Sequence, residues 1–538
     1  EYDIVIVTKQ REAVMGVYLN PGNDAFAESL NSEIYVDKSN MIHYTNRVLG
    51  TKQKFICISR PRRFGKSITA EMLSAYYDSS VDSHPLFSKL KIAVDSSFEQ
   101  NINKYDVLFF NIQSFLSRSD CALNMVEYLE FRVIQELAER YPDLGLESEP
   151  HLTSALEKIY SVHRKGFVFI IDEWDCVFRE KKSDVDAQTK YLDFLRDLLK
   201  DKVYVKLAYM TGILPIKKYG THSALNMFDE FSMTNPKYLA SYVGFTEEEV
   251  RDLCQKYNMD FEETRRWYDG YRFRKAEHIY SPKSVVDAMR NEAFDSYWTQ
   301  TETYEALKTY IDMNFDGLKD TVIAMLGGGH CLIDTGTFQN DMTTFHSKDD
   351  ALTLLIHLGY LAYDMDLQEV FIPNEEVRAE FARAIKASGW HEVIHAISIS
   401  EELLENTLAC NNEKVARIID NIHEEFTSIL NYNNEISLSC VISIAYYSVR
   451  RYYSIYRELP SGKGFADLVY LPRIQYPEKP AMIIELKWDK TATGSIRQIK
   501  DKNYIKGLKN YSGTVLLVGI NYNKSDKHHE CLIETIQI

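Results

Sequence analysis

Residues 55–73 read FICISRPRRFGKSITAEML: a short apolar run, a basic loop and the start of an amphipathic helix. The end of the loop, Gly65-Lys66-Ser67, fits the phosphate-binding pattern G-x-x-x-x-G-K-S/T, but Arg60 stands where that pattern has its first glycine. A strand that leads through a loop into a helix directs backbone amides and the positive helix end at one point, which favours a bound phosphate. The stretch therefore predicts a nucleotide site in which Lys66 binds the phosphates and Ser67 binds Mg²⁺. The alternative is that G-K-S stands at a helix start by chance.

Two later stretches supply the other groups that such a site needs. The apolar run FVFIIDE, residues 167–173, ends in two acids, of which Asp172 can hold the Mg²⁺ shell and Glu173 can polarise an attacking water. The run YVKLAYMTG brings Thr211 to a strand end, where related NTPases have a polar residue that senses the γ-phosphate. Solvated acids at a strand end remain the alternative for the first of these stretches.

The order of strands and helices predicts the organisation of the chain. Apolar strands alternate with helical stretches between residues 55 and 215, which indicates a parallel α/β sheet covered on both faces. Thr246, followed by Glu249, predicts a capping box, and helical periodicity continues to about residue 430. Past residue 450 the chain returns to strands, so we expect a second, smaller α/β domain.

We expect four segments along the chain: an unplaced N-terminal stretch, a P-loop domain, a helical domain and a C-terminal α/β domain. Their expected bounds are 1–14, 15–243, 244–400 and 401–538.

Composition narrows the partners and the compartment. The 538 residues carry a net charge of −16, which argues against a nucleic-acid partner, but residues 450–509 hold 13 basic and six acidic side chains. No apolar stretch approaches the length of a membrane span, so we expect no membrane partner. Eight scattered cysteines without a C-x-x-C pair indicate free thiols in a reducing cytoplasm.

The C-terminal strands carry a second set of reactive groups. Asp467 lies in FADLVYLP, and Glu485 and Lys487 lie two residues apart in AMIIELKW, so the latter pair points to one face of a strand. If the two strands are neighbours, two carboxylates and an ammonium converge. This is the chemistry of metal-dependent phosphodiester cleavage, in which Asp467 and Glu485 hold Mg²⁺ and Lys487 positions or deprotonates the attacking water. A salt bridge between strand-end charges is the alternative.

Five stretches resemble a bacterial AAA-ATPase-like family whose usual companion is a C-terminal nuclease-fold domain. They are EIYVDKSNMI (33–42), RPRRFGKS (60–67), IIDEWD (170–175), TGILPI (211–216) and WYDGYRF (267–273). The resemblance covers roughly residues 15–290 and implies that the arginine-rich loop is the normal form in this family. It also suggests that YDGY packs near the nucleotide, although an ordinary turn explains those residues equally well.

The resemblance implies that one loop binds the cofactor, ATP. Its residues are Arg60, Pro61, Arg62, Arg63, Phe64, Gly65, Lys66, Ser67 and Ile68. Arg62 and Arg63 contact either phosphate or a neighbouring subunit, or they are charges of a solvated loop; the sequence leaves these alternatives open.

The C-terminal triad resembles the D…(E)xK signature of the PD-(D/E)XK nuclease superfamily, with Ala466 where the signature has proline. The resemblance implies a role for Gln498, on the following helix, near the active lysine. It also implies a third metal-binding acid, for which Glu435 is the first candidate and Glu458 the second, each with a solvated surface acid as the alternative.

Together these patterns predict an ATP-hydrolysing enzyme with a Mg²⁺-dependent nuclease-like domain that acts on DNA or RNA, with cleavage gated by the nucleotide. One alternative is an NTPase signalling switch whose nuclease-like domain binds nucleic acid or protein without cutting; the acidic total charge favours it and the intact triad opposes it. A P-loop kinase would need an acceptor pocket and a lid, which we do not identify in the sequence. A homo-oligomer is left open.

Overall fold

The computed structural model describes residues 15–216, 225–274, 276–298, 304–313, 315, 317–339, 342, 345–426, 435–461, 464–508 and 511–538. The expected N-terminal segment 1–14 lies outside these residues. The chain divides into two compact units, Glu1–Thr301 with Leu332–Val377 (unit 1) and Glu302–Cys331 with Arg378–Ile538 (unit 2). None of the helices in the described ranges is long and apolar enough to cross a membrane.

Unit 1 contains a five-stranded parallel sheet in the order β2-β3-β4-β1-β5. The strands are β1 (Phe55–Ser59), β2 (Asp106–Asn111), β3 (Phe167–Asp172), β4 (Val205–Gly212) and β5 (Asp229–Phe231). β1 and β3 are buried along their whole length. This agrees with their nearly continuous apolar sequences, because a parallel sheet is covered on both faces.

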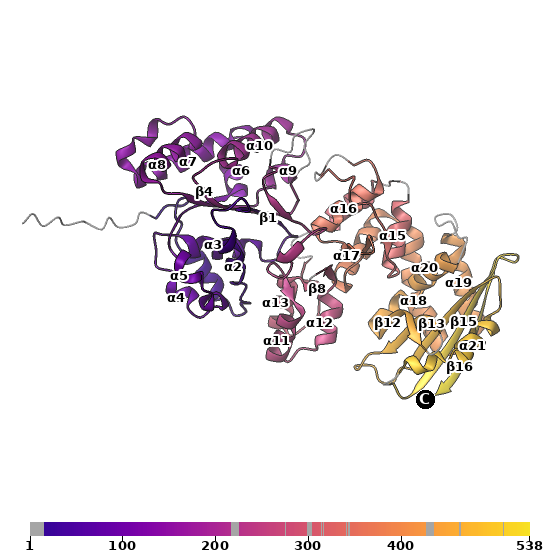
Figure 1. Ribbon diagram of the computed structural model, residues 1–538. Coiled ribbons are helices and arrows are strands. Elements are labelled where there is room, and N and C mark those ends of the chain that lie inside the picture. Colours follow the sequence, from indigo (N-terminus) through magenta and orange to yellow (C-terminus); the bar gives the residue numbers. More distant parts are fainter. Residues whose placement is uncertain are drawn as a thin grey trace, which may run out of the picture. The chain divides into compact units, whose positions relative to one another are not determined.

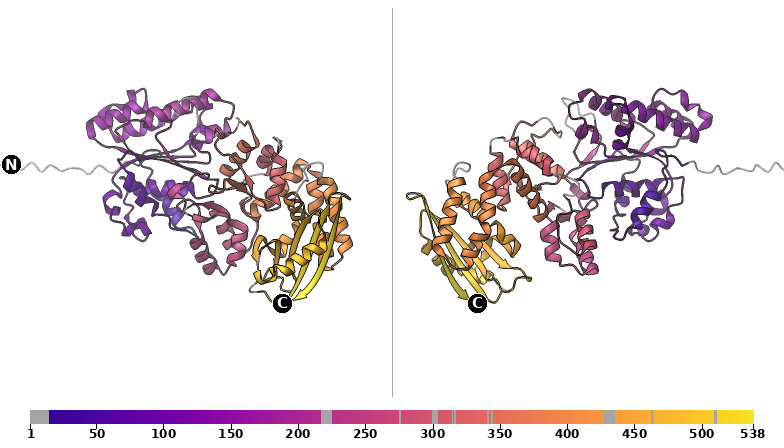
Figure 2. Two further views of the ribbon diagram at one scale, coloured as in Figure 1. Left: turned by 45° about the vertical axis from the view of Figure 1, so that its right-hand side comes forward. Right: turned by 180° about the vertical axis from the view of Figure 1, so that it is seen from behind.

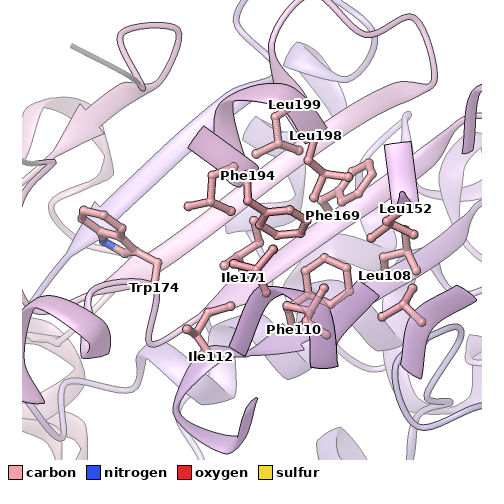
Figure 3. Close-up of a cluster of buried hydrophobic side chains, with 14 of the residues drawn as sticks. Leu108, Phe110, Ile112, Leu152, Phe169, Ile171, Trp174, Phe194, Leu198 and Leu199 are labelled. Atoms are coloured by element: carbon pink, nitrogen blue, oxygen red, sulfur yellow. The ribbon is translucent and has the colours of Figure 1, made fainter. Parts of the chain in front are cut away.

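Helices cover both faces of this sheet (Figures 1 and 2). On one face lie α2 (Met41–Val48), α3 (Lys66–Tyr77), α4 (His84–Phe87) and α5 (Phe98–Asn101), and α1 (Asp24–Leu30) packs on α3. On the other face lie α6 (Ile112–Arg118), α7 (Met125–Arg140), α8 (Leu152–His163), α9 (Cys176–Glu180) and α10 (Val185–Leu199). Figure 3 shows the core of this second face, where Phe110 and Phe169 from the sheet meet Leu152 and Leu198 from the helices.

The rest of unit 1 is mainly helical, with short strands that the sequence reading missed. Its helices are α11 (Glu247–Tyr257), α12 (Phe261–Tyr268), α13 (Pro282–Asn291) and α16 (Lys348–Leu358). Its short strands are β6 (Phe245–Thr246), β7 (Tyr271–Phe273), β8 (Ala276–Tyr280), β10 (Ala362–Asp364) and β11 (Glu369–Phe371), and β6-β8-β7 form an antiparallel sheet. The capping box of Thr246 and Glu249 at the start of α11 is confirmed.

Unit 2 combines helices with a mixed sheet in the order β12-β13-β14-β15-β16. The strands are β12 (Tyr453–Ser461), β13 (Gly464–Pro472), β14 (Ala481–Trp488), β15 (Thr514–Asn523) and β16 (His528–Gln537). The helices are α14 (Tyr304–Ile311), α15 (Leu318–Leu326), α18 (His391–Leu408), α19 (Asn412–Phe426), α20 (Glu435–Ala445) and α21 (Ala492–Asp501). Two elements span the boundary between the units, β9 (Cys331–Leu332) and α17 (Glu375–Ser388).

The sheet of unit 2 has one parallel strand pair, β14 with β15, and α21 is the crossover between these two strands. A side chain at Gly519, on β15, would place its Cβ 2.5 Å from the carbonyl oxygen of Ala492. The crossover helix therefore lies directly on the sheet at this glycine. The expected fold class, a parallel P-loop sheet, a helical middle region and a C-terminal mixed α/β domain, is confirmed; the expected domain bounds remain a prediction.

Candidate functional site

The phosphate loop follows β1 and ends at Gly65, which precedes α3 with a left-handed φ of 87°. A Cβ at Gly65 would meet no atom within 4 Å, so its conformation, rather than a lack of space, requires glycine. The backbone amide of Thr69 donates to the Gly65 carbonyl at 3.1 Å. Helical amides that precede this one have no partner inside the helix, which is the arrangement that binds anions.

Lys66, Ser67 and Asp172 meet between the start of α3 and the end of β3. The Lys66 side chain is buried, and its Nζ donates to the Pro61 carbonyl at 2.8 Å. Ser67 Oγ donates to Asp172 Oδ2 at 2.8 Å. Burial lowers the pKa of Lys66, which neighbouring acids oppose, and burial raises the pKa of Asp172, which the hydrogen bond from Ser67 opposes. The structure thus brings together the two residues predicted to hold Mg²⁺.

Glu173 begins the turn after β3 with a φ of 53°. Its Oε2 accepts a charge-assisted hydrogen bond from Nη2 of Arg179, on α9. Nε of Arg179 also donates to Oδ2 of Asp175 at 3.0 Å. Neither Arg179 nor Asp175 was predicted as a site residue. Their spacing is nevertheless a sequence signal, because Asp175 ends IIDEWD and precedes α9, and an arginine four residues later can pair with it.

A cavity of about 850 Å³ lies in front of this loop. One wall contains Glu173 and the loop from Arg62 to Thr69, with Arg62, Ser67 and Ile68 exposed. The rest of the lining includes an apolar wall of Ile34, Val36, Met72, Phe245, Pro282 and Val286, and also the polar or charged side chains of Ser29, Ser32, Glu33, Lys38, Lys283 and Arg290. The sequence reading missed this apolar wall, because its residues come from four separate segments.

Arg60 does not line the cavity, although it was predicted to bind the cofactor. Its side chain is fully buried, and Nη1 donates to the carbonyls of Ser59 and Phe231, both at 2.9 Å. The guanidinium lies 5.2 Å from the ring of Phe273, and burial lowers the pKa of Arg60 to about 10. Arg60 thus lies inside the first turn of the loop, and its Nε and Nη2 have no hydrogen-bond partner in the described part of the chain.

Thr211 does not reach the cavity either. It pairs with Ile58 and Asp172 on the neighbouring strands, and its hydroxyl donates to the Ile58 carbonyl at 3.1 Å. Its side chain is fully buried, so in this conformation the hydroxyl is used within the sheet.

The WYDGYRF motif packs against the phosphate loop. The ring of Tyr271 lies edge-on to Phe64 with 5.2 Å between centroids, and its hydroxyl donates to the Gly359 carbonyl at 2.7 Å. A Cβ at Gly359 would lie 2.7 Å from Pro61. The packing near the nucleotide loop that the family resemblance suggested is therefore present.

The second site lies in unit 2, on the neighbouring strands β13 and β14. Asp467 Oδ2 accepts from the amide of Leu486 at 2.7 Å. Glu485 Oε1 accepts from Lys487 Nζ at 2.7 Å and from Nε2 of Gln498, which lies on α21. The structure thus brings the three residues of the sequence triad together with Gln498. The hydroxyl of Tyr504, six residues farther along the chain, accepts a hydrogen bond from Nε2 of Gln498 at 3.2 Å.

Glu485 has one carboxylate oxygen available for a ligand. Its side chain is 1% exposed, and Oε2 is buried without a hydrogen-bond partner in the described part of the chain. Burial, followed by the charge of Asp467, raises the pKa of Glu485 to about 7, while Lys487 opposes the rise. A buried acceptor beside a second carboxylate fits a bound cation, which would supply the missing partner.

The third acid is not placed by the structure. Glu435 is the first residue of α20 and Glu458 lies in β12, but both side chains fall outside the described residues. Among the side chains that are described, no group of three His, Cys, Asp or Glu residues is arranged to hold a metal ion.

Two family models match this chain, one in the region of the phosphate loop and one in the C-terminal region. Residues 22–222 match the family model described as "Predicted AAA-ATPase", and residues 434–530 match that of the PD-(D/E)XK nuclease superfamily. Both family resemblances expected from the sequence are thereby confirmed. A curated relative, the "Uncharacterized protein in vnfD 5'region" of Azotobacter chroococcum mcd 1, is 24% identical over 257 residues, which is 46% of this chain and 47% of the relative. The chain thus spans about half the length of that relative.

Two solved structures have distant similarity. The Aeropyrum pernix ORC2 protein in ADPNP and ADP complexes is 10% identical with a TM-score of 0.27, over 68% of this chain and 98% of that one. A DNA replication initiation factor is 13% identical with a TM-score of 0.20, over 74% of this chain and 97% of that one. Scores of this size carry no argument about function.

Proposed function

We propose that unit 1 binds and hydrolyses ATP in the cavity in front of Gly65. The observation that carries the proposal is that Lys66, Ser67 and Glu173 line one cavity, and that Ser67 Oγ donates to Asp172, which does not itself line it. The apolar part of the lining, which includes Val36 and Phe245, suits the flat face of a purine base.

The residues divide the work of hydrolysis. The loop amides and Lys66 bind the phosphates, and Ser67 with Asp172 would hold Mg²⁺, which neutralises phosphate charge when bound. Glu173 accepts a proton from the attacking water, whose oxygen bonds to the γ-phosphorus. The bond from that phosphorus to the bridging oxygen breaks, its electron pair leaves with ADP, and the proton passes to solvent. Arg62 and Arg63, which line the cavity, extend the positive surface beside the phosphates.

For unit 2 we propose Mg²⁺-dependent cleavage of DNA or RNA. Asp467 and Glu485 would hold the cation, with Glu435 first and Glu458 second as the candidate for a third acid. Oε2 of Glu485 supports this proposal, because it is a buried acceptor with no partner in the described part of the chain. Lys487 positions the attacking water, and Gln498 orients Glu485 through its other oxygen. The basic segment 450–509 supports a phosphate-bearing substrate.

Because both sites lie in one chain, we further propose that the bound nucleotide controls cleavage. We also propose that the protein acts in the cytoplasm. An unchanged cleavage rate in Lys66→Ala would remove the gating proposal.

The nuclease proposal is tested by Mg²⁺-dependent cleavage of single-stranded and double-stranded substrates with wild type and Glu485→Ala. We expect the variant to lose at least about 100-fold in rate, because it loses a metal ligand. Equal residual cleavage by both proteins would leave unit 2 as a module that binds nucleic acid or protein without cutting, which the acidic charge of −16 favours.

A further inference from the structure

We propose that Arg179 is a positioning residue that holds the Glu173 carboxylate toward the cavity for the attack of water. The proposal rests on ATP hydrolysis at this site. It adds a residue outside the phosphate loop and outside the pair of acids at the end of β3.

The contact between Arg179 and Glu173 is well sheltered. The Arg179 side chain is 6% exposed and that of Glu173 is 24% exposed. Arg179 Nη2 donates to Oε2 of Glu173, and within the residues that the structure describes Oε1 of Glu173 has no hydrogen bond. The guanidinium thus fixes one oxygen of the carboxylate, while the other is available to a water in the cavity that Glu173 lines.

Arg179 is itself held in place by Asp175. The Asp175 side chain is fully buried, and its Oδ2 accepts from Nε of Arg179 at 3.0 Å. The same oxygen accepts from the amides of Ile213 at 3.1 Å and Leu214 at 2.7 Å, directly after β4. Burial alone would lower the pKa of Arg179, but Asp175 and Glu173 raise it above its ordinary value, so the side chain stays charged.

Asp175, which holds Arg179, is also connected to the phosphate loop through Gly212. A Cβ at Gly212, the last residue of β4, would lie 2.5 Å from Asp175 Oδ1 and 2.7 Å from the ring of Trp174. The carbonyl of Gly212 accepts from the amide of Arg60 at 3.0 Å, at the start of the loop. One tightly packed turn therefore fixes both the groups that bind phosphate and, through Asp175 and Arg179, the group that acts on water. A general base that a third group orients is a recurrent arrangement in enzymes.

The experiment measures steady-state ATP hydrolysis with Mg²⁺ for wild type, Arg179→Met and Arg179→Lys. We expect Arg179→Met to lower kcat by about 10-fold to 100-fold with KM for ATP within about twofold, because the base is misplaced while the phosphate grip is intact. Arg179→Lys retains the charge and should recover part of kcat. The matched control is Arg196→Met, which breaks an exposed ion pair with Asp193 on α10 and should leave the rate unchanged.

A second comparison separates positioning from a role in folding. In Glu173→Gln, which lacks the carboxylate that Arg179 would position, the added Arg179→Met should lower kcat no further. A further loss in the double variant would overturn the proposal, as would a kcat for Arg179→Met equal to or above that of wild type. If wild type itself turns over no ATP, the proposed function fails, whereas a wild-type rate unaffected by Arg179→Met removes only the positioning role.

Discussion

Gly65 and Gly50 allow the effect of a left-handed glycine on stability to be separated from its effect on ATP binding. Both have φ between 70° and 90°, and at neither would an added Cβ meet an atom within 4 Å. Gly65→Ala and Gly50→Ala should each lower the free energy of unfolding by about 1 kcal/mol, since only backbone strain changes. Only Gly65→Ala should also weaken ATP binding, because only Gly65 shapes the phosphate loop. Chemical denaturation and nucleotide titration measure the two effects, and equal affinity in both variants would contradict this account of the loop.

Arg60 shows where residue types mislead. An arginine beside a phosphate motif suggests a phosphate ligand, and arginine is rarely fully buried. Here the sheet supplies two carbonyls and Phe273 supplies a ring, so the guanidinium is accommodated in the interior. Phe231 lies 171 residues from Arg60 in the sequence, and Phe273 lies farther still. A local sequence pattern does not predict contacts over such separations. Gly65, Lys66, Ser67 and Asp172, by contrast, occur in contiguous motifs that the sequence reading identified.

At the scale of elements, strands with long apolar runs were predictable and short strands were not. β1 and β3 follow from FICIS and FVFIID, and β13 and β14 from FADLVYLP and AMIIELKW. β6, β7 and β8 have two to five residues and pair only with each other, so their sequences carry too few alternations to indicate strands. β16 was missed because its sequence is mostly polar and four of its ten residues are exposed.

The contact of α19 with the edge of the unit 2 sheet predicts a pH dependence. The His423 ring lies 4.5 Å from that of Tyr522 and 5.0 Å from that of His529, and burial lowers the pKa of His423 to about 4. Between pH 6.5 and 4 the unfolded chain binds a proton that the folded chain does not. The titration of this group therefore leaves the free energy of unfolding unchanged above pH 6.5 and lowers it by about 3 kcal/mol as the pH falls to 4. Denaturation of wild type and His423→Phe between pH 7 and 4 measures it; an identical slope in both proteins would refute the prediction.

The fit of α21 on β15 predicts a coupled loss of stability and cleavage. Gly519 pairs with Glu485 across the strands, and a Cβ at Gly519 would lie 2.5 Å from the Ala492 carbonyl oxygen. Gly519→Ala must therefore displace α21, at a cost of about 1–3 kcal/mol in the free energy of unfolding. The displacement also moves Gln498 away from Glu485. Denaturation and cleavage assays should fall together, and a variant with wild-type values in both would contradict the packing described.

At the scale of the whole molecule, the two units carry one proposed site each, and each site lies within its own unit. The gating that we propose acts from the nucleotide site on cleavage, so a substitution in the site of unit 2 should leave ATP hydrolysis intact. Glu485→Ala should abolish cleavage while ATP turnover stays at the wild-type rate. Parallel ATPase and cleavage assays check this, and a loss of ATP turnover in Glu485→Ala would show that the sites are not separable.

The most direct test of the account is ATP binding and ATP hydrolysis measured on the same preparations of wild type and Glu173→Gln. Glutamine preserves the size of the side chain and removes the carboxylate that accepts the proton. We predict that Glu173→Gln binds ATP with the affinity of wild type and that its hydrolysis rate falls at least about 100-fold. A wild type that binds no ATP, or a variant that hydrolyses it at the wild-type rate, would contradict the assignment of this cavity as an ATPase site.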